Sequence, residues 1–128
     1  MINNLAELKS FVRGECDPLR FPHREHVRIA FEILRRHSFP ETVLHYSRAL
    51  HAMAERVGKP QAYHETVTIA FLSLISERLL SGDYADFDHF ERMNADLFNK
   101  TVLQKWYLPD RLASELARRT FVLPEPGP

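Results

Sequence analysis

Residues 61–80 read QAYHETVTIAFLSLISERLL, the longest strongly apolar stretch of the chain. Its apolar side chains fall on more than one side of a helix, at Val67, Ile69, Ala70, Phe71, Leu72, Leu74 and Ile75. A helix that is apolar around most of its circumference is usually covered on several sides, so the stretch predicts a central helix. The β-branched run 66–69 favours a strand locally, whereas the length of the whole stretch favours a helix.

Shorter amphipathic stretches precede this helix. A short helix is predicted over about 4–12, and a second helix from Pro22, a residue that suits the first helical turn, to about His37. The segment Ser38-Phe39-Pro40-Glu41 matches a capping box and predicts the start of a third helix. Gly58 is placed to end that third helix, so we expect short connections between neighbouring helices.

The C-terminal third predicts shorter elements. Asp83 is the expected cap of a fifth helix, and residues 101–119 read as two short helices split at Pro109. The sequence therefore predicts an all-α, single-domain helical bundle of about four main helices plus short terminal helices. The domain is expected to span 1–128, with 124–128 as an irregular tail.

Composition narrows the function classes. The 17 Lys and Arg residues balance 17 Asp and Glu residues, so no net field attracts nucleic acid or an anionic membrane. The pairs Arg35-Arg36 and Arg118-Arg119 are interpreted as solvated helix faces. Cys16 is the only cysteine, which excludes a thiolate zinc cluster. Without an apolar signal core or a stretch of ~20 apolar residues, we expect a cytoplasmic protein with a small-molecule substrate or ligand, and a homodimer stays open.

Three histidines are the candidate metal ligands. His23 and His26 are three residues apart, so on a helix their rings lie one above the other on its apolar stripe. His64 stands at the predicted start of the central helix and is expected on the same inward face as Val67 and Phe71. In an up-down-up-down bundle the second helix and the central helix run parallel, so their N-terminal ends meet. The sequence therefore predicts that His23, His26 and His64 converge on a divalent transition metal: zinc, copper, iron or nickel.

Residues around His64 complete the candidate site. Glu65 is the candidate catalytic residue, as a general base, and it is alternatively a fourth ligand or a group that orients a ligand. Tyr63 is expected to supply a phenolic hydrogen bond, and Thr68 and Arg28 are expected in the pocket wall. The remaining histidines are interpreted as surface or structural residues, namely His37, His45, His51 and His89.

These residues also carry a resemblance. The pattern Phe21-x-His23-x-x-His26-x-Arg28-x-Ala30, the run Tyr63-His64-Glu65-Thr66-x-Thr68 and the segment 107–118 resemble a group of small bacterial helical proteins without a settled activity. The likeness runs through most of the chain from residue 21 onward. Where the C-terminal segment of that group often has paired tyrosines, this chain has Trp106-Tyr107. The resemblance implies where the site lies and implies no reaction.

Three functions stay open at this point. The first is a metal-dependent enzyme that acts on a small molecule, with an open coordination position and Glu65 moving a proton. The second is a non-catalytic metal- or ligand-binding module or a protein-interaction domain, in which Glu65 closes the ligand shell. The third is a metal-free cluster that transfers protons. The sequence does not distinguish hydrolytic, lyase-like and oxidative chemistry.

Overall fold

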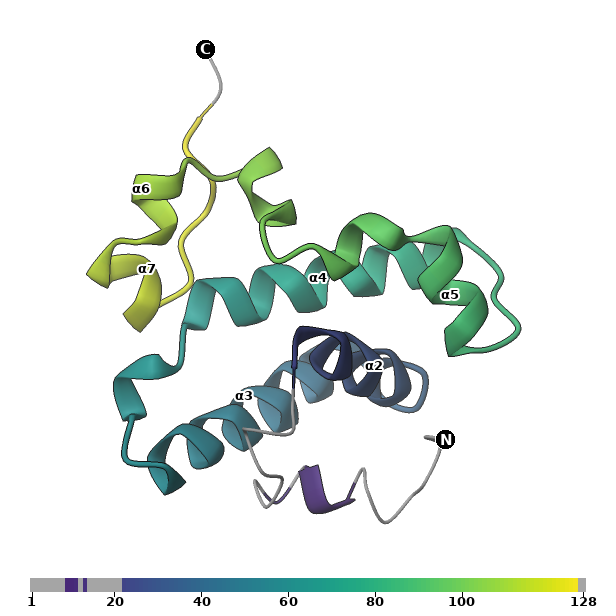
Figure 1. Cartoon of the computed structure of the whole chain (residues 1–128), viewed down its shortest axis with the longest axis horizontal. Helices are drawn as coiled ribbons and strands as arrows, with labels where there is room; N and C mark the ends of the chain where they lie inside the picture. The colour runs from purple at the N-terminus through teal and green to yellow at the C-terminus, as the bar shows by residue number, and fades with distance from the viewer. Residues whose placement is uncertain (1–8, 12, 14–21, 127–128) are drawn as a thin grey trace.

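Helix α4 (Glu65–Ser81) lies between two groups of helices in the computed structural model, which describes residues 9–11, 13 and 22–126 (Figure 1). Helices α2 (His23–Leu34) and α3 (Phe39–Arg56) pack on one side of α4. The short elements η4 (Val102–Lys105) and α7 (Glu115–Arg119) pack on the other side. The described ranges contain helices and no strand, so the predictions of an all-α fold and a central helix are confirmed.

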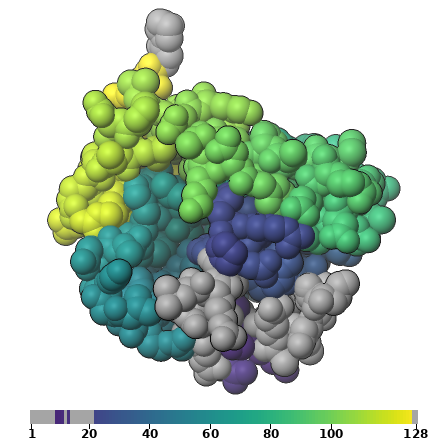
Figure 2. Space-filling view, viewed as in Figure 1, coloured from purple at the N-terminus to yellow at the C-terminus, as the bar shows by residue number. Residues whose placement is uncertain are grey.

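The remaining elements are short. They are η2 (Pro60–Ala62), α5 (Phe87–Met93), η3 (Ala95–Phe98) and α6 (Pro109–Leu112). Asp86, and not Asp83, caps α5, because its side chain accepts the backbone N–H of His89. Pro109 begins α6 as predicted, but residues 101–119 form three short pieces and not two. Figure 2 shows the C-terminal residues, coloured light green to yellow, packed against the preceding green segment.

The signals predicted for the two ends of α3 are present in the structure. The Ser38 hydroxyl accepts the Glu41 N–H, and the Glu41 carboxylate accepts the Ser38 N–H, which completes the capping box of α3. Gly58 follows α3 with φ of 74°, a left-handed conformation that glycine adopts without a steric penalty. Helix α2 begins after Pro22 but ends at Leu34, short of the predicted His37.

The start of α4 differs from the prediction. The helix was expected from Gln61, but residues 60–62 form the separate turn η2, and Tyr63 and His64 are extended. His64 is the N-cap of α4, because its Nδ1 accepts the Val67 N–H at 3.1 Å. The expectation that His64 lies on an inward helical face is therefore wrong, since His64 precedes the helix.

The hydrophobic core includes side chains from the helices on both sides of α4. One cluster of buried side chains extends from Phe11 to Val122. Phe31 of α2 packs against α5, with ring centroids 5.0 Å from Phe90 and 5.5 Å from Phe87. Tilted and edge-on aromatic pairs of this kind add about 0.5–1.5 kcal/mol beyond the apolar area they bury.

Several expectations concern residues outside the described part. Of the helix predicted over 4–12, residues 9–11 are described and helical. The predicted loop 14–21, with Cys16 and Phe21, lies outside the described residues, so the single domain over 1–128 stays a prediction. In the ranges that the structure covers, no helix has the length and apolar character needed to cross a membrane. The cytoplasmic location also stays a prediction.

A buried hydroxyl fastens the C-terminal segment to α4. Thr66 is fully buried, its Oγ1 donates to the Thr120 carbonyl at 2.8 Å, and the same oxygen accepts the Val122 N–H at 3.0 Å. The hydroxyl of Tyr107 donates to the Val122 carbonyl at 2.8 Å. These bonds hold residues 120–122 beside the first turn of α4.

We expect Thr66→Val to lower the free energy of unfolding by about 1–3 kcal/mol, because the near-isosteric change strands the N–H of Val122 and the carbonyl of Thr120. Urea denaturation measures the change. Thr120→Val is the control, since the Thr120 side chain is exposed and its loss should shift stability by less than about 0.5 kcal/mol. Equal effects of the two substitutions would contradict the anchoring role of Thr66.

An ion pair holds η3 against α4. Arg78 donates through Nη1 and Nη2 to the two carboxylate oxygens of Asp96 at 2.9 and 2.8 Å, and Lys105 donates to the same carboxylate at 3.2 Å. These hydrogen bonds, above all those from Arg78, hold the pKa of Asp96 well below its usual range. The carboxylate is about one-third exposed, so solvent screens the pair.

The lowered pKa makes a stability prediction with a defined sign. The Asp96 carboxylate stabilises the fold above its unfolded-state pKa of about 3.9, and this contribution is lost as the pH falls below that value. We expect Asp96→Asn to lower stability at pH 7 and to show a shallower acid loss than the wild type. Denaturation midpoints between about pH 7 and pH 2.5 test this. Asp110→Asn, at an exposed position, should retain the wild-type pH profile.

Candidate functional site

His23 and His26 line one cavity of about 90 Å³ between α2, α3 and α4. Two further polar residues, Tyr46 and Thr68, contribute to its wall. The other described lining residues are apolar, namely Val27, Ala30, Leu50, Val67, Phe71, Leu72 and Ile75. A space of this size suits a few water molecules or an ion with small ligands. We call it the histidine cavity, and it includes Thr68, as the sequence predicts for the pocket wall.

The ring of His23 has a defined tautomer when it is neutral. Its Nε2 lies 2.9 Å from the backbone carbonyl oxygen of Leu97, and a carbonyl only accepts, so Nε2 carries the proton. Nδ1 then carries the lone pair. The ring packs edge-on against Phe71 with centroids 5.0 Å apart. Histidines that bind metals usually donate their second ring N–H to a carbonyl or carboxylate in this way.

Neighbouring groups position His26 and Tyr46. The Tyr46 hydroxyl donates to the backbone carbonyl of His26 at 2.9 Å, which ties α3 to the first turn of α2. Tyr46 is buried, and burial raises the pKa of its phenol far above the usual value. Tyr46 is therefore a neutral wall of the histidine cavity at any physiological pH. Arg28, the other residue predicted in the wall, is buried and donates to Glu25 at 2.8 Å.

His64 has different partners. Besides the Nδ1 bond to Val67, its Nε2 donates to the Leu112 carbonyl at 2.7 Å. Leu112 ends α6, which lies across α4 from α2 and α3 (Figure 1). His23, in contrast, contacts Phe71. Phe71 comes seven residues after His64, which is roughly 10 Å along the axis of α4. The structure thus brings His23 and His26 to one cavity and does not bring His64 there.

The three-histidine centre stays a prediction. Coordination through His64 Nδ1, the ring nitrogen that does not donate to Leu112, would require that nitrogen to give up the N–H of Val67. Within 9–11, 13 and 22–126, no three His, Cys, Asp or Glu side chains are grouped as metal ligands. The two histidines that share a cavity are His23 and His26, and these are the residues whose arrangement resembles a ligand pair.

A second cavity, of about 270 Å³, contains the predicted catalytic residue Glu65. We call it the Glu65 cavity, and it is lined by His51, Pro60, Tyr63, Glu65, Arg118 and Arg119. The Tyr63 hydroxyl donates to Glu65 Oε1 at 2.6 Å, so the expected phenolic hydrogen bond is present and goes to this carboxylate. The ring of His51 stacks on Tyr63 with centroids 3.7 Å apart.

The Tyr63 phenol lies near groups of both cavities, Glu65 of one and Thr68 of the other. Burial first, and then the hydrogen bond to Glu65, raises the pKa of the Tyr63 phenol above its usual value. The hydroxyls of Thr68 and Ser47 lie close enough to act in the opposite direction. The phenol therefore stays protonated at neutral pH and remains a donor to Glu65. Because Thr68 also lines the histidine cavity, the two cavities are neighbours.

The charges of the Glu65 cavity are unequal. Arg118 donates to the Gln61 carbonyl at 2.9 Å and pairs with Glu115, whereas the side chain of Arg119 forms no hydrogen bond or ion pair with any described residue. Glu115 neutralises Arg118, so Arg119 is the guanidinium of this cavity that can bind an anion. Sequence reasoning missed His51 and the arginine pair, because their proximity to Glu65 depends on tertiary packing. The run Arg118-Arg119 in the last turn of α7 was the one available signal.

We expect His64→Ala to destabilise the protein by about 1–3 kcal/mol, because it removes the N-cap of α4 and the bond to α6. His64→Asn should recover part of this loss, since asparagine is a good N-cap but is too short to replace the whole ring. Chemical denaturation gives both values, with the exposed His37→Ala as control. If His64→Ala matched the wild type, the ring would have no structural role.

Comparison with other proteins identifies neither a family nor a function for this site. The chain matches no protein-family model, no curated protein and no solved structure. The resemblance to small bacterial helical proteins therefore stays a prediction. The site is characterised by the contacts of its own residues, chiefly those of His23, Tyr63 and Glu65.

Proposed function

We propose that the protein is a metal-dependent enzyme that acts on a small anionic molecule. In this proposal His23 and His26 hold a divalent transition metal, and the Glu65 cavity binds the substrate. The observation that carries the proposal is the bond from His23 Nε2 to the Leu97 carbonyl, which leaves Nδ1 as a lone-pair donor beside a second histidine. We assign His64 a structural role in place of the ligand role that its sequence position predicts.

The donor chemistry fits such an ion. Imidazole nitrogens suit zinc, copper, iron and nickel, and neutral histidines leave the charge of a divalent ion uncompensated. The i, i+3 spacing on α2 places both rings on one face of the helix, and both line the histidine cavity. When bound, the metal would supply a Lewis acid with coordination positions left for water or substrate.

The chain's own residues would bind the substrate and move a proton. The guanidinium of Arg119 donates to no described residue. Its N–H groups suit the two oxygens of a carboxylate or phosphate. Glu65 would accept a proton at a carboxylate oxygen. The Tyr63 hydroxyl, which already donates to Glu65 Oε1, fixes the carboxylate and leaves Oε2 to accept. The stacked ring of His51 holds Tyr63 in this orientation.

A non-catalytic metal-binding module is the second candidate, and the small volume of the histidine cavity favours it. About 90 Å³ leaves little room for a substrate beside an ion, so the enzyme requires the neighbouring Glu65 cavity to take part. Cobalt-loaded protein distinguishes the two functions. For the enzyme, added acetate or phosphate changes the cobalt absorption spectrum, and Arg119→Gln weakens this response. For the module, neither anion changes the spectrum.

Metal analysis tests the ligand assignment. We expect protein purified without a histidine tag, or reconstituted with zinc, to carry one ion per chain. His23→Ala and His26→Ala should each lower metal affinity by at least about ten-fold, because an imidazole ligand is lost. His64→Asn and the control His37→Ala should retain the ion. Full occupancy in the His23→Ala and His26→Ala variants would refute the assignment, and loss of the ion in His64→Asn would favour the three-histidine centre.

A further inference from the structure

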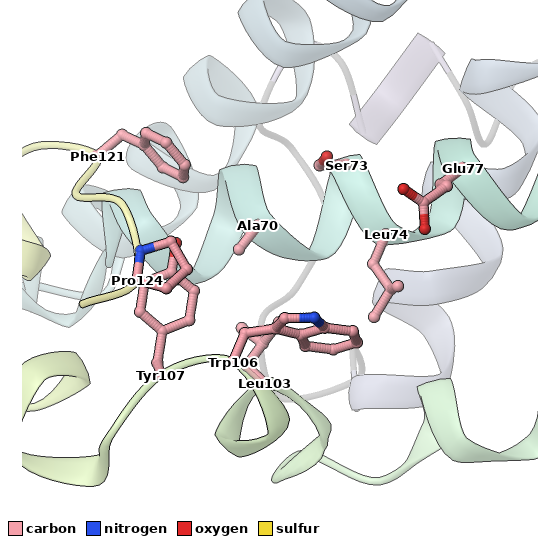
Figure 3. Close-up of a pocket in the computed structure, with 9 residues that line it drawn as sticks. All are labelled: Ala70, Ser73, Leu74, Glu77, Leu103, Trp106, Tyr107, Phe121 and Pro124. Atoms are coloured by element: carbon pink, nitrogen blue, oxygen red, sulfur yellow. The ribbon is translucent and has the colours of Figure 1, made fainter. Parts of the chain in front are cut away.

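A third cavity lies on the opposite side of α4 from the histidine cavity, under the C-terminal segment. Its volume is about 240 Å³, and it shares no lining residue with either cavity described above. Figure 3 shows side chains from three segments around it. They are Ala70, Ser73, Leu74 and Glu77 of α4, then Leu103, Trp106 and Tyr107, and finally Phe121 and Pro124.

Three aromatic rings give this cavity its character. Phe121 and Tyr107 lie at one end and Glu77 at the other, with the indole of Trp106 between them (Figure 3). Trp106 and Phe121 are 48% and 39% exposed, so their ring surfaces are open to a ligand. The Tyr107 hydroxyl is already bonded to the Val122 carbonyl. Tyr107 therefore contributes its ring and not its polar group.

The charge at this cavity is negative. Glu77 is the one charged side chain among the described lining residues, and no described residue forms a hydrogen bond or ion pair with its carboxylate. The adjacent Arg78 binds Asp96 instead. Aromatic faces are also negative, because of the ring quadrupole. The rings and the carboxylate together favour a cation and disfavour an anion.

We propose that the aromatic cavity formed by Trp106, Tyr107, Phe121 and Glu77 binds a small organic cation of the methylated-ammonium class. Methyl groups on the nitrogen pack against the ring faces and spread the positive charge over them, and tryptophan is the strongest partner in such contacts. A plain ammonium group is more strongly hydrated and fits apolar walls less well. The volume suits a ligand smaller than a typical drug-sized molecule.

This site is independent of the proposed metal chemistry. None of its residues lines the histidine cavity or the Glu65 cavity, and α4 separates it from α2 and α3. Removing metal with a chelator should therefore leave cation binding unchanged. Failure of the metal assignment and failure of the cation site are thus separate results.

The single tryptophan makes the site directly observable. Trp106 is the only tryptophan in the chain, so emission excited selectively at tryptophan, and not at the four tyrosines, reports on this cavity. Choline is the probe, and its neutral isostere 3,3-dimethylbutan-1-ol is the matched ligand that lacks the charge. We expect a saturable change in emission with choline and roughly ten-fold weaker binding of the alcohol. Equal binding of the two probes, or no saturable change with choline, would overturn the proposal.

Two variants separate the carboxylate from the rings. Glu77→Gln should weaken choline binding several-fold and leave the alcohol unaffected. The control Glu55→Gln changes an exposed glutamate of α3 that does not line the cavity, and it should bind choline as the wild type does. Trp106→Leu, followed by calorimetry, should abolish choline binding without loss of helical circular dichroism, because Trp106 is half exposed. Wild-type affinity in both Glu77→Gln and Trp106→Leu would also refute the site.

Discussion

Helix α4 carries apolar side chains on two opposite faces, and the rest of the structure follows from the need to bury both. Leu72 and Ile75 face α2 and α3, whereas Ala70 and Leu74 line the cavity under the C-terminal segment. Fully burying a leucine or isoleucine side chain contributes about 1.5–3 kcal/mol. If only one face of α4 were covered, the apolar side chains on the other face would stay exposed to water and would not contribute this stabilisation. The chain therefore places the long helices on one face and the short C-terminal elements on the other.

This layering also separates the polar groups. The histidine pair on α2 lies on one side of α4, and the ring of His64 is bonded to α6 on the other side. The Glu65 cavity lies where α4 begins, beside η2 and α7, so it lies close to both layers. Tyr63 and Thr68 connect it to the histidine cavity. The aromatic cavity, on the C-terminal side, has its own charge and its own ligand class.

Local sequence signals explain what could be predicted. The capping box at Ser38, the stop at Gly58 and the central helix depend on residues near one another in the chain, and all three hold. His23 and His26, whose spacing places them on one face of α2, both line the histidine cavity, and their role as ligands stays a prediction. The boundary of α4 could not be predicted, because the partner that fixes the ring of His64 is Leu112, 48 residues away. The stacking of His51 on Tyr63 likewise requires the turn at η2, which no periodic pattern encodes.

Helix α4 keeps the ring of His64, which is bonded to α6, apart from the rings of His23 and His26. Long-range nitrogen–proton NMR spectra of the histidine rings, recorded during a zinc titration, test it most directly. We expect ring nitrogens of His23 and His26 to shift on zinc binding, while both ring nitrogens of His64, Nδ1 included, keep their original shifts. A zinc-induced shift of the His64 ring nitrogens equal to that of the other two would contradict it.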